Sequence, residues 1–140
     1  MKSIYYFLFT CLFLTNLLAT TINIPADFAT VQEGIDAAQD GDIVLIAQGT
    51  YYENLTINKE ITLTSNADFD ALEENEGWYN DPIILQTIIN GSVIDDPNKR
   101  SCLIIRDGDI QPTIKGLTFE GGVGTSMNLI NDCTSQLPER

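Results

Sequence analysis

The chain has 140 residues, with 20 acidic and 7 basic side chains, a formal net charge of −13 and a pI near 4.1. This length corresponds to about one domain. The acidic balance provides no basic surface for phosphates, so we expect no nucleic-acid partner. The absence of histidine excludes Ser-His-Asp and Cys-His catalysis and any histidine-ligated metal. Carboxylates, Lys, Arg, Tyr and Gln remain as groups for chemistry.

Residues 1–19 are predicted to be a signal peptide. Lys2 supplies positive charge, and an apolar run extends from Ile4 to Ala19. This run is shorter than the roughly 20 apolar residues that span a bilayer. We therefore expect cleavage near Ala19 and a product that is secreted, on the cell surface or periplasmic. The alternative is an uncleaved membrane anchor; after leader removal the chain is not an integral membrane protein.

Two cysteines, Cys102 and Cys133, remain once the leader is removed. In an oxidising compartment they would close a loop with a bridge worth about 3 kcal/mol. In the alternative, Cys102 is a small core residue and Cys133 lies in a polar tail. Spacing alone does not decide between the two.

One strand and one helix begin the mature chain. Thr21–Ile24 alternates polar and apolar residues, which is typical of a strand, and Pro25 ends it. Thr30 and Glu33 have the spacing of a capping box, in which each side chain satisfies a backbone N–H of the first turn. We predict a helix over Thr30–Asp40, ended by the following glycine. Such a short helix needs an apolar surface to lie on.

Short strands follow, separated by turns. The next three are predicted at Ile43–Ile46, Leu55–Ile57 and Ile61–Thr64, with Gln48–Tyr51 as a turn. Later segments repeat an apolar pair that runs into a polar residue and a glycine, at 87–91, 103–108 and 117–121. Strands this short predict a coil whose turns stack on one another. We expect about three rungs, with equivalent strands at 43–46, 86–89 and 117–119.

The pattern breaks between Asn66 and Pro82, where acidic residues surround several aromatic ones. Such a segment is either a calcium loop or a solvated excursion whose aromatic residues fold back on the scaffold. It lacks the alternating aspartates of a dedicated calcium loop, so we assign no metal site. Trp78 and Tyr79 are candidates for stacking on a sugar ring, because an aromatic face binds apolar C–H surfaces.

The stretch from Ile22 to Asn58, with the order T-V-Q-E-x-I-D-A-A-x-D-G-D-x-V-L-I-x-x-G-T-Y-x-E-N, resembles the opening of right-handed parallel β-helix proteins of the pectin-lyase-like kind. The resemblance extends at falling strength to Gly124. It implies an all-β fold, a right-handed parallel β-helix in which the Thr30–Asp40 helix caps the first coil. Residues 20–124 would be the N-terminal part of this domain and 125–140 an irregular, truncated tail.

The resemblance implies no catalytic residue here, because the catalytic carboxylates, glutamine and arginine of pectinesterase-like members lie in later rungs. Arg106, Asp107 and Asp109 are interpreted as a turn. We expect no cofactor. Two functions compete: an exported non-catalytic module that presents a surface, and the N-terminal fragment of a carbohydrate-active enzyme, of pectinesterase or polysaccharide-lyase type, whose catalytic rungs are absent.

The partners that these functions imply are a polysaccharide or cell-surface glycan and, through the uncapped C-terminal rung, a second copy that associates end to end. Asn54-Leu-Thr56 and Asn90-Gly-Ser92 are glycosylation sequons, which we expect to matter only in a eukaryotic secretory host.

Overall fold

The computed structural model describes residues 18–75, 77–92, 100–106 and 108–124. Within them the secondary structure is mostly short strands, and each strand pair is parallel. The prediction of an all-β fold with parallel strands is therefore confirmed. The predicted tail, residues 125–140, and all but the last two residues of the predicted leader lie outside the described residues.

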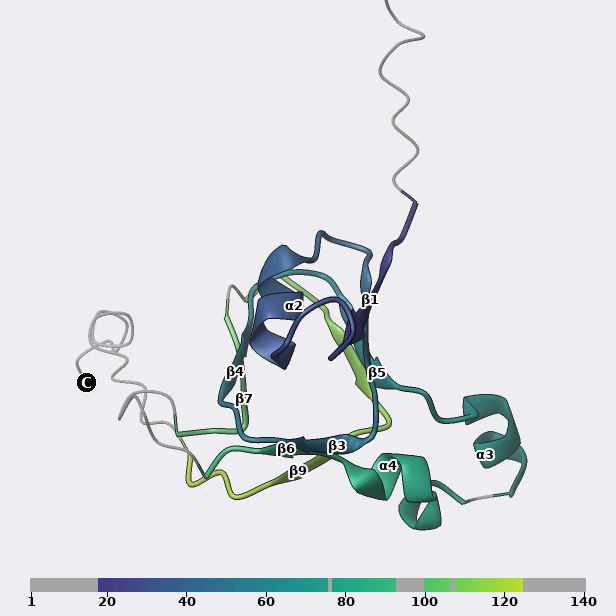
Figure 1. Ribbon diagram of the computed structural model, residues 1–140. Helices are drawn as coiled ribbons and strands as arrows, with labels where there is room; N and C mark the ends of the chain where they lie inside the picture. The colour runs from purple at the N-terminus through teal and green to yellow at the C-terminus, as the bar shows by residue number, and fades with distance from the viewer. Residues whose placement is uncertain (1–17, 76, 93–99, 107, 125–140) are drawn as a thin grey trace, which may run out of the picture.

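The strands form three parallel sheets, with the orders β1-β2-β5-β8, β3-β6-β9 and β4-β7. From β2 onward the chain passes through the four-stranded, the three-stranded and the two-stranded sheet, and repeats this order. In the view of Figure 1, the three sheets lie on three different sides of a common interior. The strands are β1 Thr21–Ile24, β2 Ile43–Ile46, β3 Gly49–Tyr51, β4 Leu55–Ile57, β5 Thr62–Ser65, β6 Thr87–Asn90, β7 Leu103–Ile105, β8 Thr113–Lys115 and β9 Thr118–Glu120.

Parallel register stacks side chains of the same face into columns. In the four-stranded sheet, one column consists of the aligned residues Ile22, Val44, Leu63 and Ile114. Val44 and Leu63 are fully buried. A second column of the same sheet, the other two sheets and helix α2 supply most of the remaining core, which is made almost wholly of aliphatic side chains.

The predicted equivalence of strands at 43–46, 86–89 and 117–119 is wrong. Ile43 is aligned with Thr62, and Thr62 with Thr113. The strands at 87–90 and 118–120 are aligned with each other and with Gly49–Tyr51, a segment predicted to be a turn. The predicted alignment failed because successive passages of the chain through the three sheets differ greatly in length. The second passage, β5 to β7, carries the segment from Asn66 to Gln86, which lies outside the strands.

Helix α2, Val31–Ala37, confirms the capping box. The Thr30 hydroxyl accepts a hydrogen bond from the backbone N–H of Glu33, and the Glu33 carboxylate accepts one from that of Thr30. The helix ends at Ala37 rather than Asp40, because Ala38 adopts an extended conformation. The glycine at 41 adopts a positive φ of 91°, but it turns the chain beyond the helix instead of capping it.

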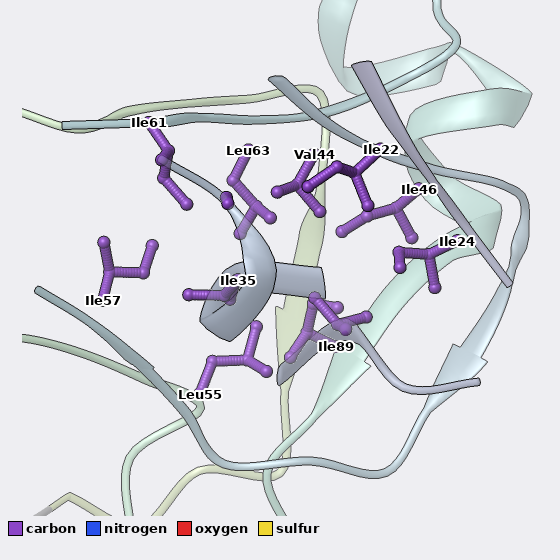
Figure 2. Packing of buried hydrophobic residues seen from close by; sticks show 12 residues of the cluster. Ile22, Ile24, Ile35, Val44, Ile46, Leu55, Ile57, Ile61, Leu63 and Ile89 are labelled. Atoms are coloured by element: carbon purple, nitrogen blue, oxygen red, sulfur yellow. The ribbon is translucent and has the colours of Figure 1, made fainter. Parts of the chain in front are cut away.

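Helix α2 packs against β1, β2 and β4, strands that belong to two different sheets. Its apolar residues Val31 and Ile35 are fully buried. Figure 2 shows Ile35 among the side chains of the core, with Leu55 and Ile57 nearby. Burying each of these two helix residues contributes about 1.5–3 kcal/mol, which explains how such a short helix is stable.

The segment from Asn66 to Gln86 contains α3 Phe69–Asn75, the 3-10 helix η2 Trp78–Asn80 and α4 Pro82–Gln86. The predicted break in the strand pattern is confirmed, but the segment is largely helical. The Asp81 carboxylate accepts hydrogen bonds from the backbone N–H groups of Ile83 and Ile84, at 2.9 and 3.0 Å. A capping aspartate followed by proline at the first helical position is the sequence signal for this helix.

Candidate functional site

Gln32 of α2 covers the outer edge of β4. Its side-chain Oε1 accepts a hydrogen bond from the backbone N–H of Thr56 at 2.8 Å, and its Nε2 donates to the Thr56 carbonyl at 3.2 Å. The amide thus takes the place of a neighbouring strand. We call the edge formed by β1, β3 and β4 the first edge. Unpaired strand edges promote association with other chains, and this contact covers the β4 part of the first edge.

Two charged residues of the first passage hold the ends of α2. The Glu53 carboxylate accepts hydrogen bonds from the backbone N–H groups of Val31 and Gln32, both at 2.9 Å. The Lys59 ammonium donates to three carbonyls at the other end, those of Ile35, Asp36 and Ala38 at 3.0, 2.6 and 2.7 Å. The negative carboxylate lies at the positive N-terminal end of the helix dipole and the positive ammonium lies at the negative C-terminal end, so each charge stabilises the helix. Neither contact is predictable from the sequence next to Glu53 or Lys59, because each partner lies more than 20 residues away along the chain.

Asp42 ties the start of β1 to the segment after α2. This buried carboxylate accepts hydrogen bonds from the backbone N–H groups of Gln39 and Thr20, at 2.8 and 2.7 Å. These two bonds, in that order of importance, lower the pKa of Asp42 below its usual value. The charged form of Asp42 therefore fixes the start of β1, which is one strand of the first edge.

The opposite edge of the sheets, which we call the last edge, is formed by β7, β8 and β9. Ile105 is 46% exposed although its aligned partner Ile57 is completely buried. Phe119 is 39% exposed although its aligned partner Ile89 is completely buried. Within the described part of the chain, the apolar columns therefore end in solvent at the last edge.

Trp78, a predicted sugar-stacking residue, is half-buried beside the ring of Phe69. The ring centroids are 5.3 Å apart with 35° between the planes. The Lys115 ammonium lies 4.3 Å from the Phe69 centroid, which is within cation–π distance. These contacts attach the segment from Asn66 to Gln86, which we call the insertion, to β8. The side chain of Tyr79 lies outside the described part, so sugar stacking by Trp78 and Tyr79 remains a prediction.

Helix α4 is held against the three-stranded sheet by two threonine hydroxyls. Thr87 donates to the carbonyl of Ile83 at 2.6 Å, and Thr118 donates to that of Ile84 at 2.9 Å. Leu85 of the same helix is 47% exposed. The insertion therefore presents an apolar residue to solvent on an otherwise fixed helix.

The described residues assemble little acid–base machinery. No group of three or more Cys, Asp or Glu among them is arranged to hold a metal. Arg106 and Asp109 are exposed, and Asp107 lies outside the described residues. Burial and the Glu53 charge, in that order, raise the pKa of Tyr51, whose hydroxyl donates to the Ala47 carbonyl at 2.9 Å. That hydroxyl stabilises a turn.

Two smaller features are an apolar pocket and the thiol of Cys102. A shallow apolar pocket of about 230 Å³ lies between the ends of β1 and β2, and no charged side chain lines it. The Cys102 thiol is half-buried and donates to the Glu120 carbonyl at 3.1 Å. Cys133 lies outside the described residues, so the bridge between the two cysteines remains untested.

None of the helices in the described part of the chain has the length and apolar character needed to cross a membrane. No protein-family model and no solved structure matches the chain. A stretch of 47 residues, 32% of the chain, is 40% identical to part of a protein named cell surface glycoprotein from Methanothermus fervidus. The match spans 8% of that relative's length.

Proposed function

We propose that the chain is the capped N-terminal part of a right-handed parallel β-helix of the pectin-lyase-like kind, and that it acts as an exported, non-catalytic surface module. The repeated order in which the chain visits three parallel sheets supports the β-helix. The observation that carries the proposal is the difference between the two edges. At the first edge α2 packs against β1 and β4 and Gln32 bonds the backbone of β4, whereas Ile105 and Phe119 are exposed at the last edge.

Export to a surface rests on the predicted leader and on the short match. The relative is named as a cell surface glycoprotein, and the predicted signal peptide would deliver this chain to the same kind of location. The test is fractionation of cells that express the complete coding sequence. A product that begins near residue 20 in the medium, the periplasm or the surface fraction supports export, and an intact cytoplasmic product refutes it.

The open last edge is proposed to associate end to end with a second copy. Edge strands with free N–H and C=O groups and exposed apolar columns favour such pairing. Sedimentation velocity over a concentration series tests this, with Ile105→Asp as the disruptive variant and Leu85→Asp as the matched control, since the two side chains are 46% and 47% exposed. Association weakened equally by both variants, or by neither, would refute this role of the last edge.

The proposed ligand class is a polysaccharide or a cell-surface glycan, bound through Trp78 and Tyr79. Trp78 packs against the ring of Phe69 in a tilted arrangement, which fixes the position of the Trp78 ring before any ligand arrives. An ordered aromatic ring is suited to the apolar face of a sugar. A glycan-array screen of the exported chain tests it. Trp78→Ala should weaken binding about tenfold, and Leu85→Ala, on the same insertion, should leave it unchanged.

A further inference from the structure

The two sequons of this chain lie in contrasting environments. A glycan is attached to the side-chain Nδ2 of the asparagine, and the hydroxyl two residues later forms part of the acceptor signal. The Asn54 Nδ2 donates two hydrogen bonds, to the carbonyl of Gly91 at 3.1 Å and to that of Ser101 at 2.9 Å. Both hydrogens of this amide are therefore committed to contacts with the next passage of the chain.

The remainder of the first sequon is also enclosed. Leu55 is fully buried, and the Thr56 hydroxyl is buried without a hydrogen-bond partner in the described part of the chain. The backbone of Gly91 approaches so closely that a Cβ there would lie 3.0 Å from the Asn54 Nδ2. A sugar on Asn54 would have to separate the two stacked turns.

Asn90 lies on the outer face of β6. Its neighbour Ile89 is fully buried, so alternation directs Asn90 away from the core. It is half-buried and aligned with Glu120, which is exposed. Continuing the register of β3 and β6 by one residue places Tyr52, which is 60% exposed, on its other side.

The amide orientation of Asn90 is fixed by its own turn. Its Oδ1 accepts a hydrogen bond from the backbone N–H of Ser92 at 3.0 Å, which is an Asx turn. Its Nδ2 has no hydrogen-bond partner among the residues that the structure describes, and Ser92 is exposed. The second sequon therefore presents, on the outer face of the three-stranded sheet, an accessible serine and an amide nitrogen that donates no hydrogen bond to the described residues.

We propose that Asn90 is an N-glycosylation site of the folded chain and that Asn54 is not. In the reaction, the Asn90 Nδ2 forms a bond to the anomeric carbon of an activated sugar. The bond from that carbon to the diphosphate oxygen breaks, the diphosphate leaves with the electron pair, and the amide nitrogen releases one proton. The donor is a sugar diphosphate carried on a nucleotide or a lipid.

The test uses the folded chain, produced from the complete coding sequence in a bacterium that does not N-glycosylate. It is incubated with UDP-glucose and a soluble sequon-specific N-glucosyltransferase, chosen because it modifies unfolded peptides that carry either sequon. Peptide mass spectrometry should find glucose on Asn90. Asn54 should react at least about thirtyfold more slowly, the factor expected when two hydrogen bonds must first break.

Ser92→Ala should abolish transfer to Asn90 while leaving the Asx turn intact, because the turn uses the backbone N–H of residue 92. The proposal is overturned if Asn54 reacts as fast as Asn90, or if Asn90 stays unmodified in the folded chain. Modification in the cell rests on the proposed export, but this assay does not, so failure of sugar transfer and failure of export are observed separately.

Discussion

Replacing Lys59 by methionine removes the charge that holds the C-terminal end of α2 and keeps most of the aliphatic stem. The ammonium donates to three carbonyls, at 2.6, 2.7 and 3.0 Å. A hydrogen bond to a charged group contributes about 1.5–3 kcal/mol. The three bonds share one ammonium, and water can replace part of the interaction at this partly open helix end. We therefore expect a loss of about 2–3 kcal/mol in the free energy of unfolding.

The measurement is equilibrium unfolding in urea, followed by far-UV circular dichroism. Fluorescence of the single tryptophan is less suitable, because Trp78 lies in the insertion and not beside α2. Lys115→Met is the matched control: it makes the same change in net charge but removes one cation–π contact with Phe69, worth about 0.5–1 kcal/mol. If Lys59→Met cost less than about 1 kcal/mol, or no more than the control, the reasoning about the helix end would be refuted.

Three further predictions concern stability and are checked by the same unfolding measurement. Thr56→Val should stabilise the fold by about 1 kcal/mol, because its buried hydroxyl has no partner in the described part; a loss of stability would contradict this. Gly116→Ala should destabilise by about 1–3 kcal/mol, because φ is +66° and the new Cβ would lie 2.6 Å from atoms of Phe69 and Ser65; a neutral outcome would refute the close contact. Because the pKa of Asp42 is lowered on folding, the stability it contributes is present above the unfolded pKa and is lost as the pH falls below about 4. Asp42→Asn should flatten the acid side of the stability profile, and an unchanged profile would exclude this role.

Local signals in the sequence predicted the elements whose stability is itself local. The Thr30–Glu33 capping box and the alternation of Thr21–Ile24 depend on neighbours within a few residues, and both are confirmed. The end of α2 was predicted wrongly because its carbonyls are satisfied by Lys59, more than 20 residues away. Nothing in the local sequence reports that contact.

Strand alignment was the part that sequence could not supply. Apolar pairs followed by glycine occur both in the three-stranded sheet, at β6 and β9, and in the two-stranded sheet, at β7. The pattern therefore identifies strands without saying which sheet each one joins. The insertion before Thr87 then makes one passage much longer than the preceding one. For the candidate sites, the sequence located Trp78 and both sequons. Only the structure distinguishes Asn54, whose amide nitrogen donates two hydrogen bonds, from Asn90, whose amide oxygen alone is bonded among the described residues.

The central claim is that parallel strands stack in register and that α2 covers the first edge at β1 and β4. The most direct test is a set of cross-strand nuclear Overhauser effects in the isotopically labelled chain. We predict that Val44 contacts both Ile22 and Leu63 in the parallel pattern, and that the Ile35 methyl groups contact Leu55. Close Hα–Hα contacts between these strands, which antiparallel pairs produce, or an Ile35 side chain remote from Leu55, would contradict the account.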